Sequence, residues 1–126
     1  MWRVLMGVAI VALTALAGIV GVRAHFLPDP RLHKREVILR DDLFTMRSLI
    51  DQYTLDKQRA PQSLDDLVQS GYLKEIPVDP FTNSRNTWTV VQEDVMQSMD
   101  KSQPGMTDVH SGSRLIGSDG RPYSDW

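Results

Sequence analysis

Three polar residues near the end of the sequence, Asp108, His110 and Ser111, are of the types that form hydrolytic triads. Such a triad needs a hydroxyl nucleophile, a histidine that takes its proton and a carboxylate that orients the histidine. Residues 106–110 are predicted to form a strand, and neighbouring residues of a strand point to opposite faces. Ser111 would therefore turn away from His110, whereas Asp108 and His110 share a face. We expect a structural hydrogen bond between Asp108 and His110 rather than catalysis.

The rest of the sequence offers little chemistry for an enzyme. It contains no G-x-S-x-G, no H-E-x-x-H and no glycine loop of the kind that cradles phosphate. It has no cysteine, which excludes disulfides, thiol catalysis and cysteine-ligated metal sites. The formal net charge is −2, without the basic balance typical of nucleic-acid binding. We therefore expect a chain that is not an enzyme and does not bind nucleic acid.

The first part of the chain is strongly apolar. In residues 4–22 every side chain is apolar, glycine or threonine, and as a helix this stretch would span roughly 28 Å, close to the hydrocarbon core of a bilayer. Two interpretations are open: an uncleaved signal-anchor, or a secretory signal cut after Ala24. The apolar run is longer than the usual core of a signal peptide. Residues 1–24 are therefore predicted to be a transmembrane anchor.

The charges around this anchor conflict with the orientation that we adopt below. Arg23, Arg31, Lys34 and Arg35 follow the apolar run, and only Arg3 precedes it. The positive-inside rule, taken alone, would place the rest of the chain in the cytoplasm.

Residues 25–35 are predicted to be a semi-rigid connector rather than a helix, because Pro28 and Pro30 both disfavour helical continuation. His25 and His33 lie in this stretch. We interpret them as solvated linker residues and not as metal ligands.

The globular domain is predicted to span residues 36–126 and to begin with an amphipathic helix over residues 36–57. Apolar residues recur there at alternating steps of four and three, which places them on one helix face. This stripe needs a sheet or a partner helix to cover it. A heptad coiled coil is the alternative, but about three heptads is short for one. The stripe consists of Leu39, Leu43, Met46, Ile50 and Tyr53.

A short second helix is predicted after Pro61. Ser63 can cap its start, and Asp66 stands three residues further on, in the position of a reciprocal capping box. Gly71 suits the position just past its end.

Two β-strands are predicted later in the chain, over residues 87–91 and 106–110. Along the second strand, alternation places Met106 on the same side as Asp108. The polar residues 93–105 between them are expected to form a helical turn or a mobile loop. Helices first and strands after predict an α+β domain, with the long helix laid across a small antiparallel sheet.

Seven pieces of this predicted domain, in their order along the chain, match one protein family. They are residues 42–53, 63–68, 71–73, 76–81, Trp88, 108–111 and 119–126. The most specific block is SLDDLV, followed by GYL and then by IPVDPF. Together they resemble the major pseudopilin of type II secretion, the general secretion pathway protein G-like family, over roughly residues 36–126.

The resemblance implies a type IV pilin-like fold, in which an N-terminal helix packs on an antiparallel sheet. It implies a single-pass subunit of the inner membrane with its globular domain in the periplasm. Such subunits bind identical or related pseudopilins through the N-terminal helix. With an inner-membrane secretion platform, they form a filament, the pseudopilus, that serves protein export.

The N-terminus departs from the family pattern. The family carries a glutamate five residues into the mature chain, and Met6 stands there if Trp2 is the first mature residue. That glutamate is thought to pair with a neighbour's terminal amine. The alternative is therefore a membrane-anchored accessory or binding domain of pilin-like fold that does not polymerise.

The resemblance also implies a candidate calcium site in the loop that closes the domain. Calcium takes six to eight oxygen ligands, which two carboxylates with a hydroxyl, carbonyls and water can supply. The loop is shorter and less acidic than in calcium-binding members, and the alternative is a plain turn at residues 118–120. The candidate ligands are Asp119, Asp125 and Ser124 through their side chains, with Ile116 and Arg121 through their carbonyls.

Overall fold

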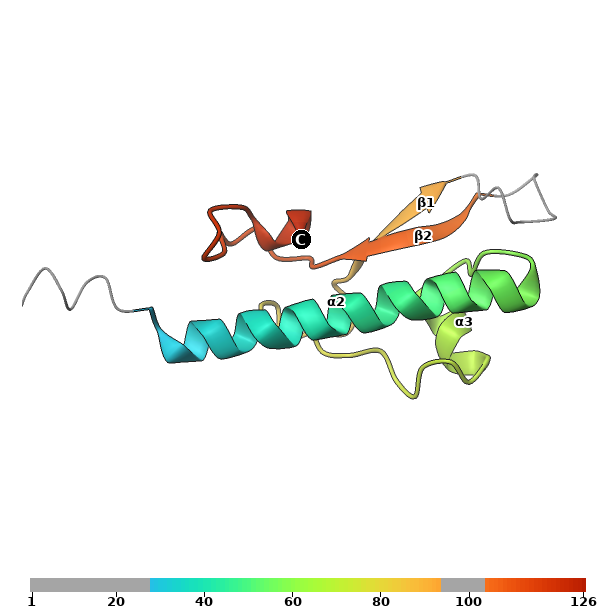
Figure 1. The fold of residues 1–126 in the computed structure, drawn as a ribbon, viewed down its shortest axis with the longest axis horizontal. Coiled ribbons are helices and arrows are strands. Elements are labelled where there is room, and N and C mark those ends of the chain that lie inside the picture. Colours follow the sequence, from blue (N-terminus) through green and yellow to red (C-terminus); the bar gives the residue numbers. More distant parts are fainter. Residues whose placement is uncertain (1–27, 94–103) are drawn as a thin grey trace, which may run out of the picture. The chain divides into compact units, whose positions relative to one another are not determined.

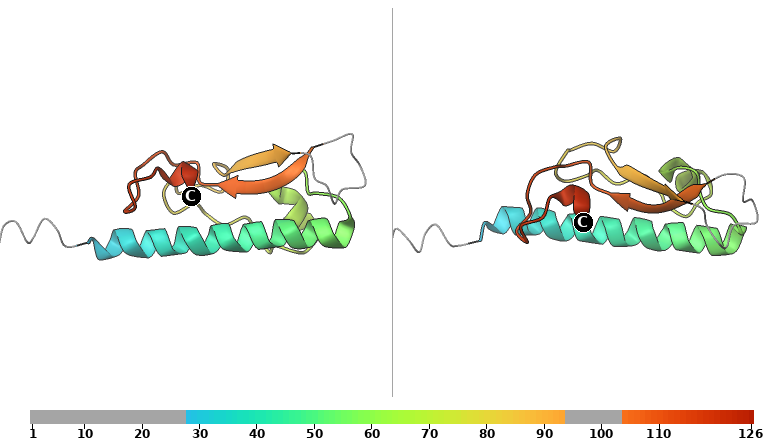
Figure 2. Two further views of the ribbon diagram at one scale, coloured as in Figure 1. Left: turned by 45° about the horizontal axis from the view of Figure 1, so that its top comes forward. Right: turned by 90° about the horizontal axis from the view of Figure 1, so that it is seen from above.

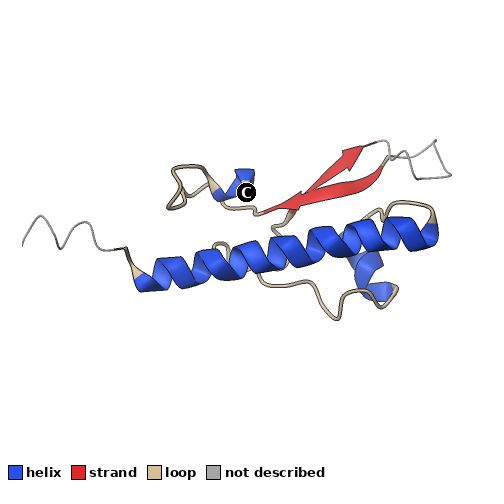
Figure 3. Ribbon diagram, in the orientation of Figure 1, coloured by secondary structure: helices blue, strands red, loops and turns tan. Residues whose placement is uncertain are grey.

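The computed structural model describes residues 28–93 and 104–126. In chain order its elements are helix α2 (Pro30–Lys57), helix α3 (Leu64–Gln69), strand β1 (Thr89–Glu93), strand β2 (Gly105–His110) and the 3-10 helix η1 (Tyr123–Asp125) (Figure 1 and Figure 3). β1 and β2 pair antiparallel and form a two-stranded sheet. The predicted α+β class, with one long helix and a small antiparallel sheet, is confirmed.

The predicted anchor, residues 1–24, and the start of the connector lie outside the described residues, as does most of the segment expected to be a helical turn or loop. Across residues 28–93 and 104–126, no helix is long and apolar enough to cross a bilayer. The anchor stays a prediction from the sequence.

α2 begins at Pro30, so the prediction of a non-helical connector was wrong for residues 30–35. Proline is accepted in the first helical turn because the N–H groups of that turn have no partner within the helix. Arg35, in this additional part, donates from Nε and Nη2 to the carbonyl oxygen of Pro80 at 3.1 and 2.7 Å. The start of the helix is thus tied to the domain.

The apolar stripe predicted for the long helix is the buried face of α2, with each of its five members at most 4% exposed. Burial of a leucine-sized side chain contributes about 1.5–3 kcal/mol, so this face is a main source of stability. The buried side chains that pack with it come from α3, β2, η1 and the neighbouring loops: Leu64, Leu67, Phe81, Met106, Val109, Tyr123 and Trp126.

α3 ends as predicted, but neither hydrogen bond of the predicted capping box forms at its start. Gly71 adopts a φ of 80°, in the left-handed region, and its N–H donates to the carbonyl of Val68. Ser63 is the N-cap residue, yet its hydroxyl makes no capping bond. The carboxylate of Asp66 instead accepts the N–H of Gln62 at 2.7 Å.

A β-bulge changes the face on which Met106 lies. Between the third and fourth residues of β1 the pairing advances two positions along β2, which leaves Thr107 as the extra residue. Met106 and Val109 are both 0% exposed. The prediction that Met106 shares a side with Asp108 was therefore wrong, because the bulge shifts the alternation by one residue.

A buried carboxylate holds the proline-containing block, residues 76–81. Asp79 is 0% exposed, and its Oδ2 accepts the hydroxyl of Ser111 at 2.6 Å and the N–H of Gly112 at 3.2 Å. A Cβ at Gly112 would lie 2.1 Å from the carbonyl oxygen of Thr87, so only glycine fits this approach. The block is thereby joined to the residues that follow β2.

Residues 111–126, which we call the closing loop, follow β2 and contain η1. The strands and the closing loop lie on the same side of α2 (Figure 1 and Figure 2). Arg47 of α2 contacts Asp108 of β2, whereas Glu36, nearer the start of α2, contacts Ser118 of the closing loop. The closing loop therefore covers the N-terminal half of α2.

The buried face of α2 predicts a large difference between two leucines of the same helix. Leu39→Ala, at 0% exposure, should lower the free energy of unfolding by about 2–5 kcal/mol through lost burial and a residual cavity. Leu55→Ala, at 58% exposure, should change it by less than about 0.5 kcal/mol. Chemical denaturation of the full chain in mild detergent, followed by circular dichroism, measures both. Equal effects would contradict the assignment of the buried face.

Candidate functional site

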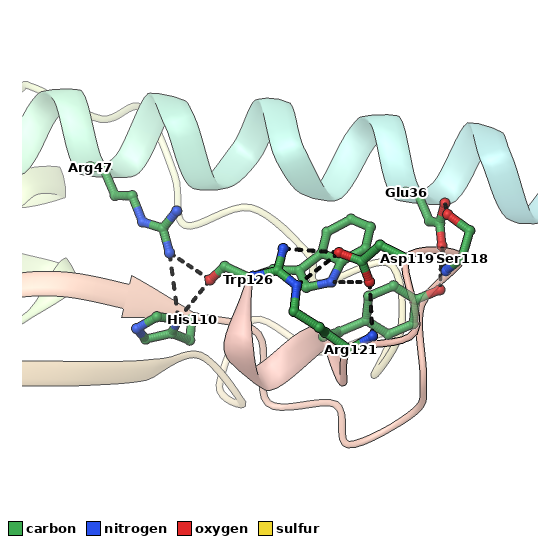
Figure 4. A network of polar contacts seen from close by, with 8 residues as sticks. Glu36, Arg47, His110, Ser118, Asp119, Arg121 and Trp126 are labelled. Carbon is green, nitrogen blue, oxygen red and sulfur yellow. Dashed lines mark hydrogen bonds and ion pairs between the residues drawn. The ribbon is translucent and has the colours of Figure 1, made fainter.

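The closing loop is attached to α2 through a buried carboxylate, Glu36, which is 1% exposed. Its Oε1 accepts the N–H of Ser118 at 2.7 Å and the hydroxyl of Tyr123 at 2.9 Å, and its Oε2 accepts the hydroxyl of Ser118 at 2.6 Å (Figure 4). All three donors belong to the closing loop. A charge is costly to bury without such partners. The buried Glu36 is therefore stable only while the closing loop supplies these donors.

These contacts also determine the protonation states of Glu36 and Tyr123. Burial alone raises the pKa of Glu36, but the hydrogen bonds from Ser118 and Tyr123 and the charge of Arg40 outweigh it and hold the pKa below the ordinary 4.5. Burial and the hydrogen bond to Glu36 raise the pKa of Tyr123 to about 12. At neutral pH Glu36 is therefore an acceptor and Tyr123 a donor.

Aromatic rings fill the space under the closing loop. Tyr123 stacks on Phe81, with ring centroids 3.7 Å apart, and meets Trp126 edge-on at 4.9 Å. Two guanidinium groups of α2 cover this cluster: Arg35 lies 4.5 Å from the Phe81 centroid and Arg40 lies 4.2 Å from that of Trp126. Aromatic pairs and cation–π contacts of this kind each contribute about 0.5–1.5 kcal/mol, which adds to the attachment through Glu36.

A second polar cluster joins α2, β2 and the end of the closing loop at Arg47. Its Nε donates to Asp108 Oδ1 at 2.6 Å, and its Nη2 donates to the backbone oxygens of Val109 at 2.8 Å and Trp126 at 2.6 Å. His110 Nδ1 lies 2.6 Å from the same Trp126 oxygen (Figure 4). One arginine thus links three segments that are far apart in the sequence.

The three residues of the triad hypothesis do not form a triad. The predicted contact between Asp108 and His110 is present, with Oδ2 and Nε2 3.3 Å apart. Ser111 instead donates its hydroxyl to Asp79 and is 0% exposed. A buried hydroxyl without the histidine as a base is not placed for attack on a substrate.

Among the calcium candidates, Asp119 and Arg121 lie together, but as an ion pair. Asp119 Oδ2 accepts Nε and Nη2 of Arg121 at 3.0 and 2.9 Å, while its Oδ1 accepts the N–H of Arg121 at 3.0 Å and the indole N–H of Trp126 at 3.3 Å (Figure 4). The backbone hydrogen bond from Arg121 is the main reason that the pKa of Asp119 is lowered.

The other candidates make local contacts. Ile116 pairs with Pro122 in an isolated bridge, and the hydroxyl of Ser124 donates to Asp125 Oδ1 at 3.4 Å. The carbonyl of Arg121 accepts the N–H of Gly117 at 2.8 Å. In the described part of the chain, no group of three or more histidine, aspartate, glutamate or cysteine side chains gathers as for a metal. The arrangement fits a guanidinium better than calcium, whose binding stays a sequence prediction.

An open groove of about 400 Å³ lies between α2 and the closing loop. Arginine side chains dominate its polar lining, and Phe44, which is 73% exposed, supplies an apolar edge. The guanidinium of Arg47 is engaged by Asp108, and that of Arg121 by Asp119. The lining residues are Arg40, Leu43, Phe44, Arg47, Ser48, Asp51, Arg121 and Trp126.

Sequence reasoning did not find Glu36 or Arg47. For Glu36 a signal existed, because it stands three residues before Leu39 and continues the spacing of the buried stripe. A charged residue in phase with an apolar stripe indicates a buried charge that has found donors. Arg47 gave no comparable signal, since a charge beside the stripe is typical of any solvated helix flank.

Comparison with known proteins identifies no relative. No protein-family model, curated protein or solved structure matches the chain. The site must therefore be interpreted from its own geometry.

The contacts of Glu36 predict the effect of Glu36→Gln. The new amide N–H₂ would face donors, so the free energy of unfolding at pH 7 should fall by about 1–3 kcal/mol. Glu75→Gln is the control, since Glu75 is exposed in an ion pair with Arg85 and should matter by less than about 1 kcal/mol. Denaturation of the full chain measures both, and equal losses would contradict the role of Glu36.

The same variant should change the response to acid. Folding lowers the pKa of Glu36, so its contribution is complete above 4.5 and is lost as the pH falls through the lower pKa of the folded state. Stability measured from pH 7 to pH 3 should therefore fall less steeply in Glu36→Gln than in the parent chain. Part of the slope should remain, because the pKa of Asp119 is lowered as well.

Proposed function

We propose that this protein is a structural, non-enzymatic subunit of a type II secretion or type IV pilus-like machine, of the pseudopilin kind. The observation that carries the proposal is α2, a 28-residue helix that begins shortly after the predicted anchor and carries the sheet and closing loop on one face. A type IV pilin-like fold has this layout. The sequence blocks quoted above add to it, because they cover this helix, α3 and the closing loop.

The face of α2 away from the core has the character of an assembly surface. Val37, Phe44 and Leu55 are 40%, 73% and 58% exposed, and their spacing of nearly whole helical turns places them on one face. Apolar side chains aligned along one helix face can pack against a partner helix. A second copy or a related subunit is the proposed partner.

The predicted anchor supplies a physical route to assembly. An apolar helix can be stored in the inner membrane, with the domain in the periplasm, and its surface can be reburied against identical helices in a filament. An inner-membrane secretion platform would extract the subunits, and the filament would serve protein export. If Trp2 is the first mature residue, Met6 stands where the family has a glutamate, and a neighbour's terminal amine loses its partner. An unpaired charge in the membrane is costly, which would weaken assembly.

That substitution also supports a second function. A membrane-anchored accessory or binding domain of the same fold would keep α2, the sheet and the closing loop but would not polymerise. The groove beside Phe44 would then be its binding surface. The two functions differ in whether copies of the anchor contact one another.

Cysteine scanning can distinguish the two functions, because the chain has no cysteine of its own. A filament contact joins two different surfaces of neighbouring copies, so the cysteines are placed in pairs at offset positions along residues 4–22. Some pairs should form disulfide-linked oligomers, whereas either cysteine of such a pair alone should not. The experiment uses membranes of cells that make a complete secretion machine. Gln58→Cys, at an exposed position just after α2, is the control. No disulfide-linked oligomers from any pair, with membrane retention, would favour the accessory domain.

The native N-terminus gives a second test. Intact mass and terminal sequencing of the protein from a membrane fraction should show a start at or near Trp2, as for pilin-type processing. A start at Met1 would favour the non-polymerising alternative. A start at His25 would mean a soluble exported domain and would contradict the membrane anchor.

A further inference from the structure

Asp119, a carboxylate at the surface of the closing loop, forms an ion pair with Arg121 of the same loop. The turn is set by the N–H of Gly120, which donates to the carbonyl of Gly117 at 3.0 Å, with Gly120 at a φ of 82°. This turn brings the side chain of Arg121 back over Asp119. Both Nε and Nη2 of the guanidinium then reach one carboxylate oxygen, Oδ2.

The pair is connected to the core and is not an isolated surface contact. The other oxygen, Oδ1, accepts the indole N–H of Trp126, which is 8% exposed. Trp126 in turn packs against Tyr123, whose hydroxyl binds Glu36. Asp119 is therefore connected, through Trp126 and Tyr123, to the contact that attaches the closing loop to α2.

Both carboxylate oxygens of Asp119 already accept hydrogen bonds, so a divalent metal would have to compete with these donors. Asp119 accepts four hydrogen bonds, and the guanidinium of Arg121 lies against the oxygen that a metal would need. The carbonyl of Arg121 is itself engaged by the N–H of Gly117. Calcium would need six to eight oxygens and would have to displace a positive charge.

We propose that the Arg121 guanidinium, rather than a bound metal ion, neutralises Asp119 and holds the closing loop in place. The planar fork of arginine suits this role, because it is permanently charged and reaches a carboxylate through two N–H groups. The domain then closes independently of the calcium concentration around it. This inference concerns the stability of a single chain and stands apart from assembly into a filament.

Thermal unfolding of the full chain in mild detergent tests the proposal. The parent chain should unfold at the same midpoint in EGTA and in calcium at about 5 mM, which exceeds the dissociation constants of weak calcium sites. Arg121→Gln should lower the midpoint by about 2–5 °C in EGTA. Arg121→Lys, which keeps the charge but not the fork, should lower it by less.

Arg114→Gln is the matched control in the same loop. Arg114 is exposed, and among the described residues it makes no polar contact through its side chain, so its midpoint should equal that of the parent chain. Two results would overturn the proposal. One is a parent midpoint that calcium raises by several degrees. The other is an Arg121→Gln midpoint equal to that of the parent chain and of Arg114→Gln.

Discussion

The buried carboxylate of Glu36 is the constraint on which the rest of the domain depends. A charge with 1% exposure is stable only if donors surround it, and Ser118 and Tyr123 of the closing loop provide them. While its hydroxyl donates to Glu36, the ring of Tyr123 stacks on Phe81. Phe81 is in turn held by the block around Asp79. One polar contact near the start of α2 is thus linked, through Tyr123 and Phe81, to the block around Asp79.

The parts of the fold that were predictable are those encoded by neighbouring residues. The stripe of α2 from Leu39 to Tyr53 is a periodic pattern within one helix, and all its members are buried. The end of α3 at Gly71 depends on one residue's left-handed conformation. Both follow from local physics, so the sequence alone was sufficient.

The features that were missed depend on residues far apart in the sequence. The bulge at Thr107 shifts the alternation of β2, and strand periodicity alone could not place it. The ion pair between Asp119 and Arg121 is a local feature that was also missed, because spacing does not show where a guanidinium turns. The calcium site itself stays a prediction. Arg47 binds oxygens of β2 and of Trp126, and the sequence around Arg47 contains no pattern that predicts either partner.

The attachment of the closing loop also has a consequence for the order of folding. Glu36 is separated by 82 residues from Ser118 and by 87 from Tyr123, and Arg47 is separated by 79 from Trp126. Contacts across such separations form late, because the entropy of closing a long chain must be overcome first. During synthesis α2 emerges long before its partners, with its core face and Glu36 uncovered. A nascent chain can therefore reach its native state only after the closing loop has been synthesised, and until then its uncovered core face exposes it to chaperones and proteases.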